Sequence, residues 1–239
     1  MTFRSLGSSS QGNCYLLEEG GSLLMIDCGF GIRELKSRGL DVKTANLLGV
    51  LVTHNHGDHI KGLESLRKAC PDVPFFANQM TADASKLKCE FTIFENGSDF
   101  DVGPFSVHSF STVHDVPDPV GFKVNNYFHC TDCGSILESI GRQFAEAEEA
   151  TLESNHDLVL LNGSRRAPSV INRIKGPSGH LSNDQACEFV ERFISPKLKK
   201  LNLAHLSQDC NAPHIARNAM RETLEELGRG DVVLEVLES

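Results

Sequence analysis

Three histidines and an aspartate lie within six consecutive residues, in a segment that reads Thr53-His-Asn-His-Gly-Asp-His59. Imidazole and carboxylate groups need partners when they are buried, so such a dense cluster is not a core pattern. Mixed nitrogen and oxygen donors at this density are typical of a site for divalent metal ions. We expect His54 and His56 to hold one ion, and Asp58 and His59 to face a second. The alternative is a solvated polar loop without a ligand.

The cluster follows the apolar run Gly49–Thr53, which reads as a buried strand. Functional side chains often gather where strands of a sheet end, and the predicted metal site has this position. Gly57 lies between the first pair of donors and the second. Its backbone freedom allows the chain to turn there.

The composition is that of an ordinary globular protein, with 239 residues, 40% hydrophobic and 23% charged. It excludes disordered, collagen-like and coiled-coil chains. Without a repeat or a linker-like stretch, residues 1–239 are predicted to form a single domain. Apolar runs such as Leu158–Leu161 are too short to cross a bilayer, and residues 1–11 lack the features of a signal peptide. We therefore expect a cytoplasmic protein without a membrane partner.

The formal net charge of −9 argues against a protein that coats nucleic acid, which needs a basic face. It does not argue against an enzyme that engages one phosphate at a time. The eight cysteines are spread through the chain and are expected to be reduced thiols. Cys130 and Cys133 form the CxxC pair. Either thiolate is chemically competent as a zinc ligand, but small buried cysteines are the favoured interpretation.

Short β-rich runs dominate the first half of the chain, and the second half alternates between strand and helix patterns, which indicates the α/β class. The strands predicted in the first half are Cys14–Leu17, Leu23–Asp27, Gly49–Thr53, Pro74–Ala77, Phe91–Glu95, Phe105–Phe110 and Phe122–Phe128. The later predicted strands are Asp157–Asn162, Leu201–Leu206 and Asp231–Val236. The predicted helices are His59–Ala69, Ser135–Thr151, Asn183–Phe193 and Pro213–Leu227, with Ser182 as the cap of the third.

The pattern HxHxDH at His54–His59 resembles the signature of the metallo-β-lactamase-fold hydrolases. This resemblance extends over nearly the whole chain and implies a four-layer αββα sandwich. It also implies His114 as the third ligand of the first ion and His205 as the last ligand of the second. Asp132 would bridge the two ions. Zinc is the first expectation for both, with manganese or iron as alternatives.

Further segments are similar to the YycJ (WalJ) type within these hydrolases. They include Leu6–Asn13, Val113–Gly121, Leu152–Asp157 and Ser178–Asn183. The resemblance implies a phosphodiesterase or nuclease that trims single-stranded nucleic acid from the 5′ end. It implies catalytic roles for Asp58, Asp132 and His180, with His180 contacting the scissile phosphate or protonating the leaving oxygen.

The substrate-binding candidates come from three segments. Residues 164–180 carry four basic residues and no acid, and Arg165 and Arg166 are expected to face phosphate unless the stretch is simply a solvated helix face. The loop with Ser9 and Asn13 offers hydroxyl and N–H donors, although Gly12-Asn13 also fits a plain turn. His156 is a candidate for hydrogen bonds to ligand or phosphate, with loop capping as the alternative.

Two other functions fit such a site. The first is a small-molecule hydrolase of a lactam, lactone or thioester, for which the His180 motif has no evident use. The second is a diiron redox protein, but such relatives usually carry an acidic ligand within the first motif, where this chain has His56.

Overall fold

The computed structural model describes residues 1–238, which divide into two compact units. Unit 1 comprises residues 1–109 and 116–120, and unit 2 comprises residues 110–115 and 121–238. Each unit joins strands to helices around its own hydrophobic core. The expected α/β class with two sheets and helices is confirmed. The assignment of residues 1–239 to one domain stays a prediction.

Unit 1 is built on a six-stranded sheet whose strands follow in chain order. They are β1 (Thr2–Ser9), β2 (Gly12–Glu19), β3 (Ser22–Ile26), β4 (Leu47–Leu51), β5 (Phe75–Ala77) and β6 (Thr92–Ile93). The first three strands pair antiparallel and the rest parallel. Four helices follow or connect them: α1 (Ile32–Ser37), α2 (Gly57–Ile60), α3 (Leu63–Ala69) and α4 (Gln79–Ser85). Strand β7 (Asp99–Val102) pairs with β8 (Phe105–Ser111), which runs on into unit 2.

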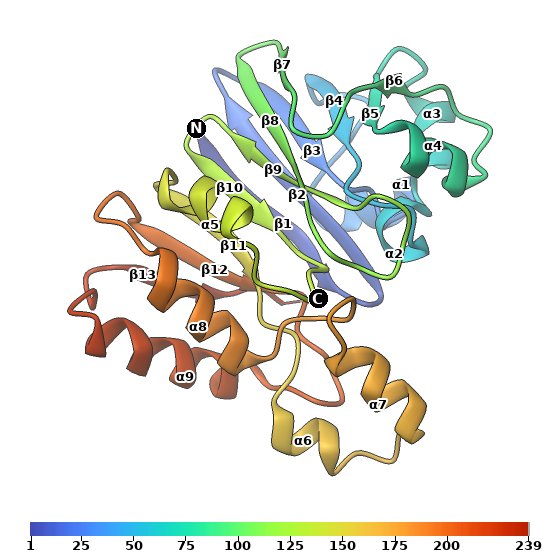
Figure 1. The fold of residues 1–239 in the computed structure, drawn as a ribbon. Helices are drawn as coiled ribbons and strands as arrows, with labels where there is room; N and C mark the ends of the chain where they lie inside the picture. Colours follow the sequence, from blue (N-terminus) through green and yellow to red (C-terminus); the bar gives the residue numbers. More distant parts are fainter. Residues whose placement is uncertain (239) are drawn as a thin grey trace. The chain divides into compact units, whose positions relative to one another are not determined.

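Unit 2 is built on the run of strands β9 to β13, paired in chain order. They are β9 (Val120–Val124), β10 (Tyr127–Cys130), β11 (Glu149–Glu153), β12 (Lys200–Ala204) and β13 (Val233–Val236). From β10 onward the pairing is parallel, so the carboxyl ends of these strands share one edge. The helices are α5 (Glu138–Ala145), α6 (Leu158–Asn162), α7 (Pro168–Lys175), α8 (Asn183–Phe193) and α9 (Pro213–Glu226). Figure 1 shows α8 and α9 side by side, with α6 and α7 apart from them.

Three sequence predictions of secondary structure are wrong in unit 2. The segment Asp157–Asn162 is not a strand but helix α6, because the Asp157 side chain accepts a hydrogen bond from Leu160 N and caps it. The predicted helix Ser135–Thr151 is only α5, and its last part belongs to strand β11. Phe122–Phe128 is a hairpin of β9 and β10, turned at Asn125 with a φ of 52°.

The helix predicted over His59–Ala69 is interrupted and becomes α2 and α3. Gly62 lies at the break, where a Cβ atom would approach the Phe30 carbonyl oxygen to 2.0 Å. Other details are confirmed. Ser182 caps α8 in a reciprocal arrangement with Gln185, and all eight cysteines are free.

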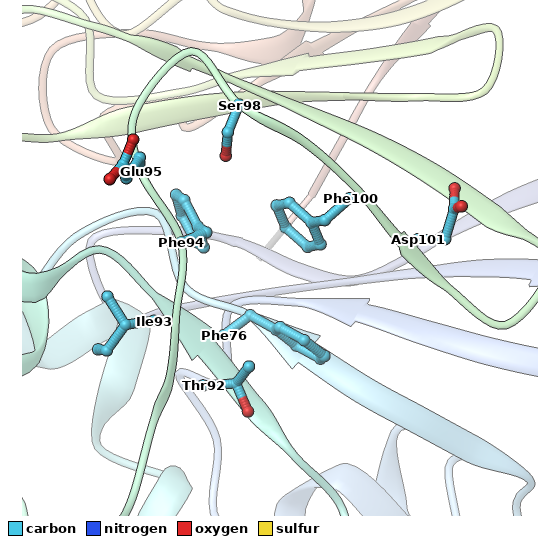
Figure 2. A pocket seen from close by; sticks show the side chains of 8 residues that line it. All are labelled: Phe76, Thr92, Ile93, Phe94, Glu95, Ser98, Phe100 and Asp101. Atoms are coloured by element: carbon cyan, nitrogen blue, oxygen red, sulfur yellow. The ribbon is translucent and has the colours of Figure 1, made fainter.

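A pocket of about 430 Å³ lies in unit 1 beside strand β6, the last strand in its sheet (Figure 2). Phe76 and Phe94 both stack on Phe100 there, with ring centroids 5.6 and 5.2 Å apart. Glu95 and Asp101 supply its carboxylates. Its lining contains neither histidine nor cysteine, so it lacks the donors expected of the metal site.

Within residues 1–238, no helix is long and apolar enough to cross a membrane.

Candidate metal and catalytic centre

The predicted donors of unit 1 follow strand β4 directly, as expected from the sequence. His54 and His59 are buried, with ring centroids 4.0 Å apart, and the ring of His56 lies 4.9 Å from that of His54. His56 occupies the N-cap position of α2, and Asp58 lies in its first turn. The short helix thus keeps the His59 ring next to that of His54.

Asp27 orders this loop, although the sequence pattern did not single it out. It lies directly after β3, and its fully buried carboxylate accepts hydrogen bonds from the Thr53 backbone N–H at 2.9 Å and the Thr53 hydroxyl at 2.8 Å. The same carboxylate accepts a 2.7 Å hydrogen bond from His59 Nδ1. Because Nδ1 of His59 is engaged in this way, its lone pair lies on Nε2.

His54 is oriented in the same manner through Thr53. The Thr53 hydroxyl donates its hydrogen to Asp27, and its oxygen lies 3.0 Å from Nδ1 of His54. A chain of two hydrogen bonds thus fixes Nδ1 and leaves the lone pair of His54 on Nε2. Such support from outside the ligand set is typical of histidines that bind metal.

Asn13 is fully buried and contacts two of the predicted metal ligands of unit 1. Its side-chain amide donates to Asp58 Oδ2 at 3.1 Å and lies 3.0 Å from His59 Nε2. Ser9 is also buried, and its carbonyl oxygen accepts from the same amide at 3.0 Å. The structure thus links Asn13 to two predicted metal ligands. The predicted contact of Ser9 and Asn13 with substrate stays a prediction.

The donors of unit 2 come from the carboxyl ends of three neighbouring parallel strands. Asp132 follows β10, Glu153 ends β11 and His205 follows β12. Together with His180 they offer donor atoms that all lie within 4.8 Å of one another, close enough to hold a metal ion. The edge of the sheet thus brings together two predicted ligands, Asp132 and His205, with the predicted catalytic His180.

Glu153 is the main functional residue that sequence reasoning missed. Its side chain is fully buried, and Oε1 accepts hydrogen bonds from Nδ1 of His180 at 2.8 Å and Nδ1 of His205 at 2.9 Å. Its other oxygen accepts from the backbone N–H groups of Cys133 and Leu181. Glu153 lies within Leu152–Asp157, one of the segments similar to the YycJ type, but the mistaken helix over Ser135–Thr151 concealed its place at the end of a strand.

The electrostatics of this group favour an ionised Glu153 and a protonated His180. Burial alone would raise the pKa of Glu153, but the charge of His180 and the hydrogen bonds from His180 and His205 hold it at about 2. Burial alone would lower the pKa of His180, yet the charge and hydrogen bond of Glu153 and the charge of Asp132 raise it. The Glu153 carboxylate thus favours the protonated form of the His180 ring.

His114 lies after β8, where the sequence predicted it, and its side chain is almost fully buried. Its Nδ1 donates to the Gly179 carbonyl oxygen at 3.0 Å, which again leaves the lone pair on Nε2. Its Nε2 lies 3.7 Å from Asp132 Oδ1. Of the CxxC pair, Cys133 Sγ donates to the Ser135 carbonyl oxygen at 3.1 Å, and both thiols are buried.

Three of the six described non-glycine residues with a left-handed backbone belong to the donor groups or support them. Asp27, Asp132 and His205 have φ values of 57°, 55° and 56°. This left-handed region is unfavourable for residues with a Cβ atom, although Asp and His visit it more readily than most. Asp27 and His205 each follow the last residue of a strand directly, and Asp132 lies two residues after the end of β10. The chain leaves the sheet at these positions.

The remaining predicted substrate contacts lie in unit 2. His156 is fully buried, and its ring nitrogens have no hydrogen-bond partner among the described residues. Arg165 and Arg166 lie between α6 and α7, beside a cavity of about 470 Å³. All three roles stay predictions.

Comparison with known proteins identifies the family. A family model described as "Beta-lactamase superfamily domain" matches residues 23–201. The exodeoxyribonuclease YycJ of Bacillus anthracis is 30% identical, over 95% of this chain and 90% of that protein. The chain belongs to the metallo-β-lactamase-fold hydrolases of the YycJ (WalJ) type. The exodeoxyribonuclease WalJ of Streptococcus pneumoniae is 29% identical over 94% of this chain and 88% of its own.

Two solved structures of low sequence identity have the same fold. The metallo-β-lactamase fold protein YhfI from Bacillus subtilis matches with a TM-score of 0.75 over 99% of this chain and 95% of its own, at 17% identity. The short form of human tRNase Z matches with a TM-score of 0.67 over 100% and 97%, also at 17% identity. The resemblance deduced from the HxHxDH pattern is thereby confirmed.

Proposed function

We propose that this protein is a dinuclear metal-dependent phosphodiesterase that removes nucleotides from the 5′ end of single-stranded DNA. Its similarity to the exodeoxyribonucleases YycJ and WalJ, over nearly the full length of each, supports the substrate class. The observation that carries the proposal is the hydrogen bonding of Glu153 Oε1 to both His180 and His205. It connects an acid–base residue to a predicted metal ligand through one buried carboxylate.

The predicted ligands fit divalent metal ions. In His54, His59, His114 and His205, an oxygen atom lies within hydrogen-bond distance of Nδ1, so that Nε2 is the lone-pair nitrogen in each. The residues that would hold the ions are His54, His56, Asp58, His59, His114, Asp132 and His205. Zinc is the proposed metal, since imidazole and carboxylate donors suit it, and manganese and iron are the alternatives.

When bound, the ions supply Lewis-acid stabilisation of the phosphate and a water of lowered pKa. The protein's own contribution to bond cleavage comes from His180. Because Nδ1 of His180 donates to Glu153, the protonated ring presents its remaining N–H at Nε2. From there it can give a proton to the oxygen that leaves the phosphorus atom. Glu153 holds the ring in this orientation and keeps it protonated to higher pH.

The alternative is a small-molecule hydrolase of a lactam, lactone or thioester. The relatives of matching length are named exodeoxyribonucleases, which favours a phosphodiester substrate. Turnover of the chromogenic lactam nitrocefin at a rate above any nuclease activity would favour the alternative.

The test is a gel assay of end-labelled single-stranded DNA, with and without a 5′ phosphate, after incubation with the zinc- or manganese-loaded protein. We expect progressive loss of the strand from its 5′ end. His56→Ala and Asp58→Ala should abolish this loss, because each removes a proposed ligand. Intact DNA with both metals, or cleavage at the normal rate by either variant, would contradict the proposal.

A further inference from the structure

Residues 158–175, the α6–α7 arm, form a basic segment in an acidic protein. The arm carries Arg165, Arg166, Arg173 and Lys175 and contains neither Asp nor Glu, whereas the whole chain has a net charge of −9. A local reversal of charge of this kind attracts anions, and arginine matches phosphate oxygens with its planar fork.

The turn between α6 and α7 lines a cavity of about 470 Å³ with Ser164, Arg165 and Arg166. Asp209 lies across from them and accepts a 2.8 Å hydrogen bond from Arg166 Nη2. The Nε atom of Arg166 is buried and has no partner among the described residues. The Arg166 side chain is still 35% exposed and lines the cavity, and Arg165 beside it is exposed. This cavity has the size and the donors for a phosphate group.

The arm is connected directly to the catalytic group of unit 2. Arg173 Nε donates to Asp115 Oδ2 at 2.5 Å, and Asp115 is adjacent to the predicted ligand His114. At the end of the arm, the carbonyl oxygen of Ile174 accepts a 3.0 Å hydrogen bond from His180 N. A polymer held along the arm would therefore lead towards His180.

The arm buries little of its own surface. Helix α7 contains no buried residue, and α6 buries only Leu161. Apolar side chains are left exposed, with Val159 at 79%, Leu160 at 40% and Val170 at 36% of their accessible surface. An exposed surface that is both basic and apolar suits a partner that is anionic and partly apolar, as a single strand with unpaired bases is.

We propose that the α6–α7 arm binds the sugar–phosphate backbone of a single nucleic-acid strand and holds one or two phosphates on Arg165 and Arg166. The identity of the strand rests on the proposed function. An anionic lipid surface has related chemistry, but the links from Arg173 and Ile174 to Asp115 and His180 favour a substrate strand. Recognition through phosphates predicts binding that is independent of base sequence and sensitive to salt.

The experiment measures binding apart from cleavage, by fluorescence anisotropy of a labelled oligothymidylate with hydrolysis-resistant phosphorothioate linkages. We expect the double variant Arg165→Ala/Arg166→Ala to weaken binding about tenfold or more. If two phosphates are no longer neutralised, the slope of log affinity against log salt should also become shallower by about 1.4, which is about 0.7 for each phosphate. Asp209→Asn should strengthen binding about twofold or more, because it releases Arg166 from its carboxylate partner.

Arg142→Ala/Arg192→Ala is the matched control. Both arginines lie in unit 2 outside the arm and pair with a glutamate four residues earlier on their own helix. This control removes the same charge and should leave affinity nearly unchanged. Equal losses of affinity in the two double variants, or none in the arm variant, would overturn the inference. Arginine-dependent binding to phosphatidylserine vesicles without binding to DNA would overturn it as well.

Failure of the proposed function gives a different result. In that case the metal-loaded wild-type protein leaves end-labelled DNA intact, while the anisotropy measurement still shows whether the arm binds the strand. Conversely, a protein that degrades DNA but binds it equally well without Arg165 and Arg166 keeps the function and loses the inference.

Discussion

Glu153 Oε1 accepts a 2.8 Å hydrogen bond from Nδ1 of His180, and the Glu153 side chain is fully buried. A buried carboxylate with four donors around it is held in one geometry, and it transmits that geometry to the imidazole. The side chain of His180 is 19% exposed. Glu153 therefore supports the ring from the interior, while His180 itself reaches the surface.

The first prediction concerns Glu153→Gln, which removes the charge and keeps the approximate shape. Without the carboxylate the pKa of His180 should fall, because the charge and hydrogen bond that raise it are absent. We expect kcat to decrease about 10- to 100-fold and the alkaline limb of the pH–rate profile to move to lower pH. A decrease in kcat with an unchanged pH profile would contradict the assigned role and indicate a general structural defect.

The second prediction concerns Asp27→Asn, which weakens the hydrogen bond that fixes His59. Metal affinity, measured by competition with a chromophoric chelator, should fall about 10- to 100-fold. Asp41→Asn is the control, since Asp41 pairs on the surface with Lys36 and does not touch the loop. Equal metal affinity in the Asp27 variant and in wild type would show that His59 does not depend on this carboxylate.

The third prediction concerns the pH dependence of stability. Burial lowers the pKa of His156 to about 4. Between pH 6.5 and 4 the unfolded chain therefore binds a proton that the folded chain does not, and this residue makes stability fall as the pH falls. The full effect is on the order of 3 kcal/mol at pH 4.

His156→Leu should remove this contribution, so that thermal unfolding between pH 7 and 5 depends less on pH than in wild type. At pH 7 the variant should be at least as stable, because the ring nitrogens have no partner among the described residues to lose. Parallel pH dependence in variant and wild type would contradict this account of His156.

The fourth prediction concerns Gly179, next to His180. A Cβ atom there would lie 2.1 Å from the Ile174 carbonyl oxygen and 2.4 Å from that of Arg173, so the backbone would have to move. Gly179→Ala should lower the free energy of unfolding by about 2 kcal/mol or more. Gly230→Ala is the control, since nothing lies within 4 Å of its added Cβ, and it should change stability by less than about 0.5 kcal/mol.

The sequence predicted those site residues that lie in one short segment or directly after one strand. The cluster His54–His59, as well as His114, Asp132 and His205, lie after strands as expected. Asp27, Asn13 and Glu153 were not predicted as supporting groups, because hydrogen bonds between distant segments leave no local pattern. Glu153 and His205 are 52 residues apart, and only the parallel pairing of β11 with β12 makes them neighbours.

The errors in secondary structure have two origins, one local and one tertiary. Leu158–Leu161 is an apolar run that fits a strand, but the Asp157 cap decides for a helix. The Glu/Ala-rich composition of residues 145–151 favours a helix, but pairing on both sides, with β10 and with β12, makes its last part a strand. Tertiary pairing outweighed intrinsic propensity there.

The left-handed backbone at Asp27, Asp132 and His205 sets a limit on engineering this protein. Each conformation costs on the order of 1–3 kcal/mol for a residue other than glycine. Glycine would relieve the strain at all three positions, and it would remove a proposed ligand or its support at each. At Asp27, glycine would also leave the Thr53 backbone N–H and His59 Nδ1 without their buried acceptor, so relief of backbone strain there is opposed by the loss of hydrogen bonds.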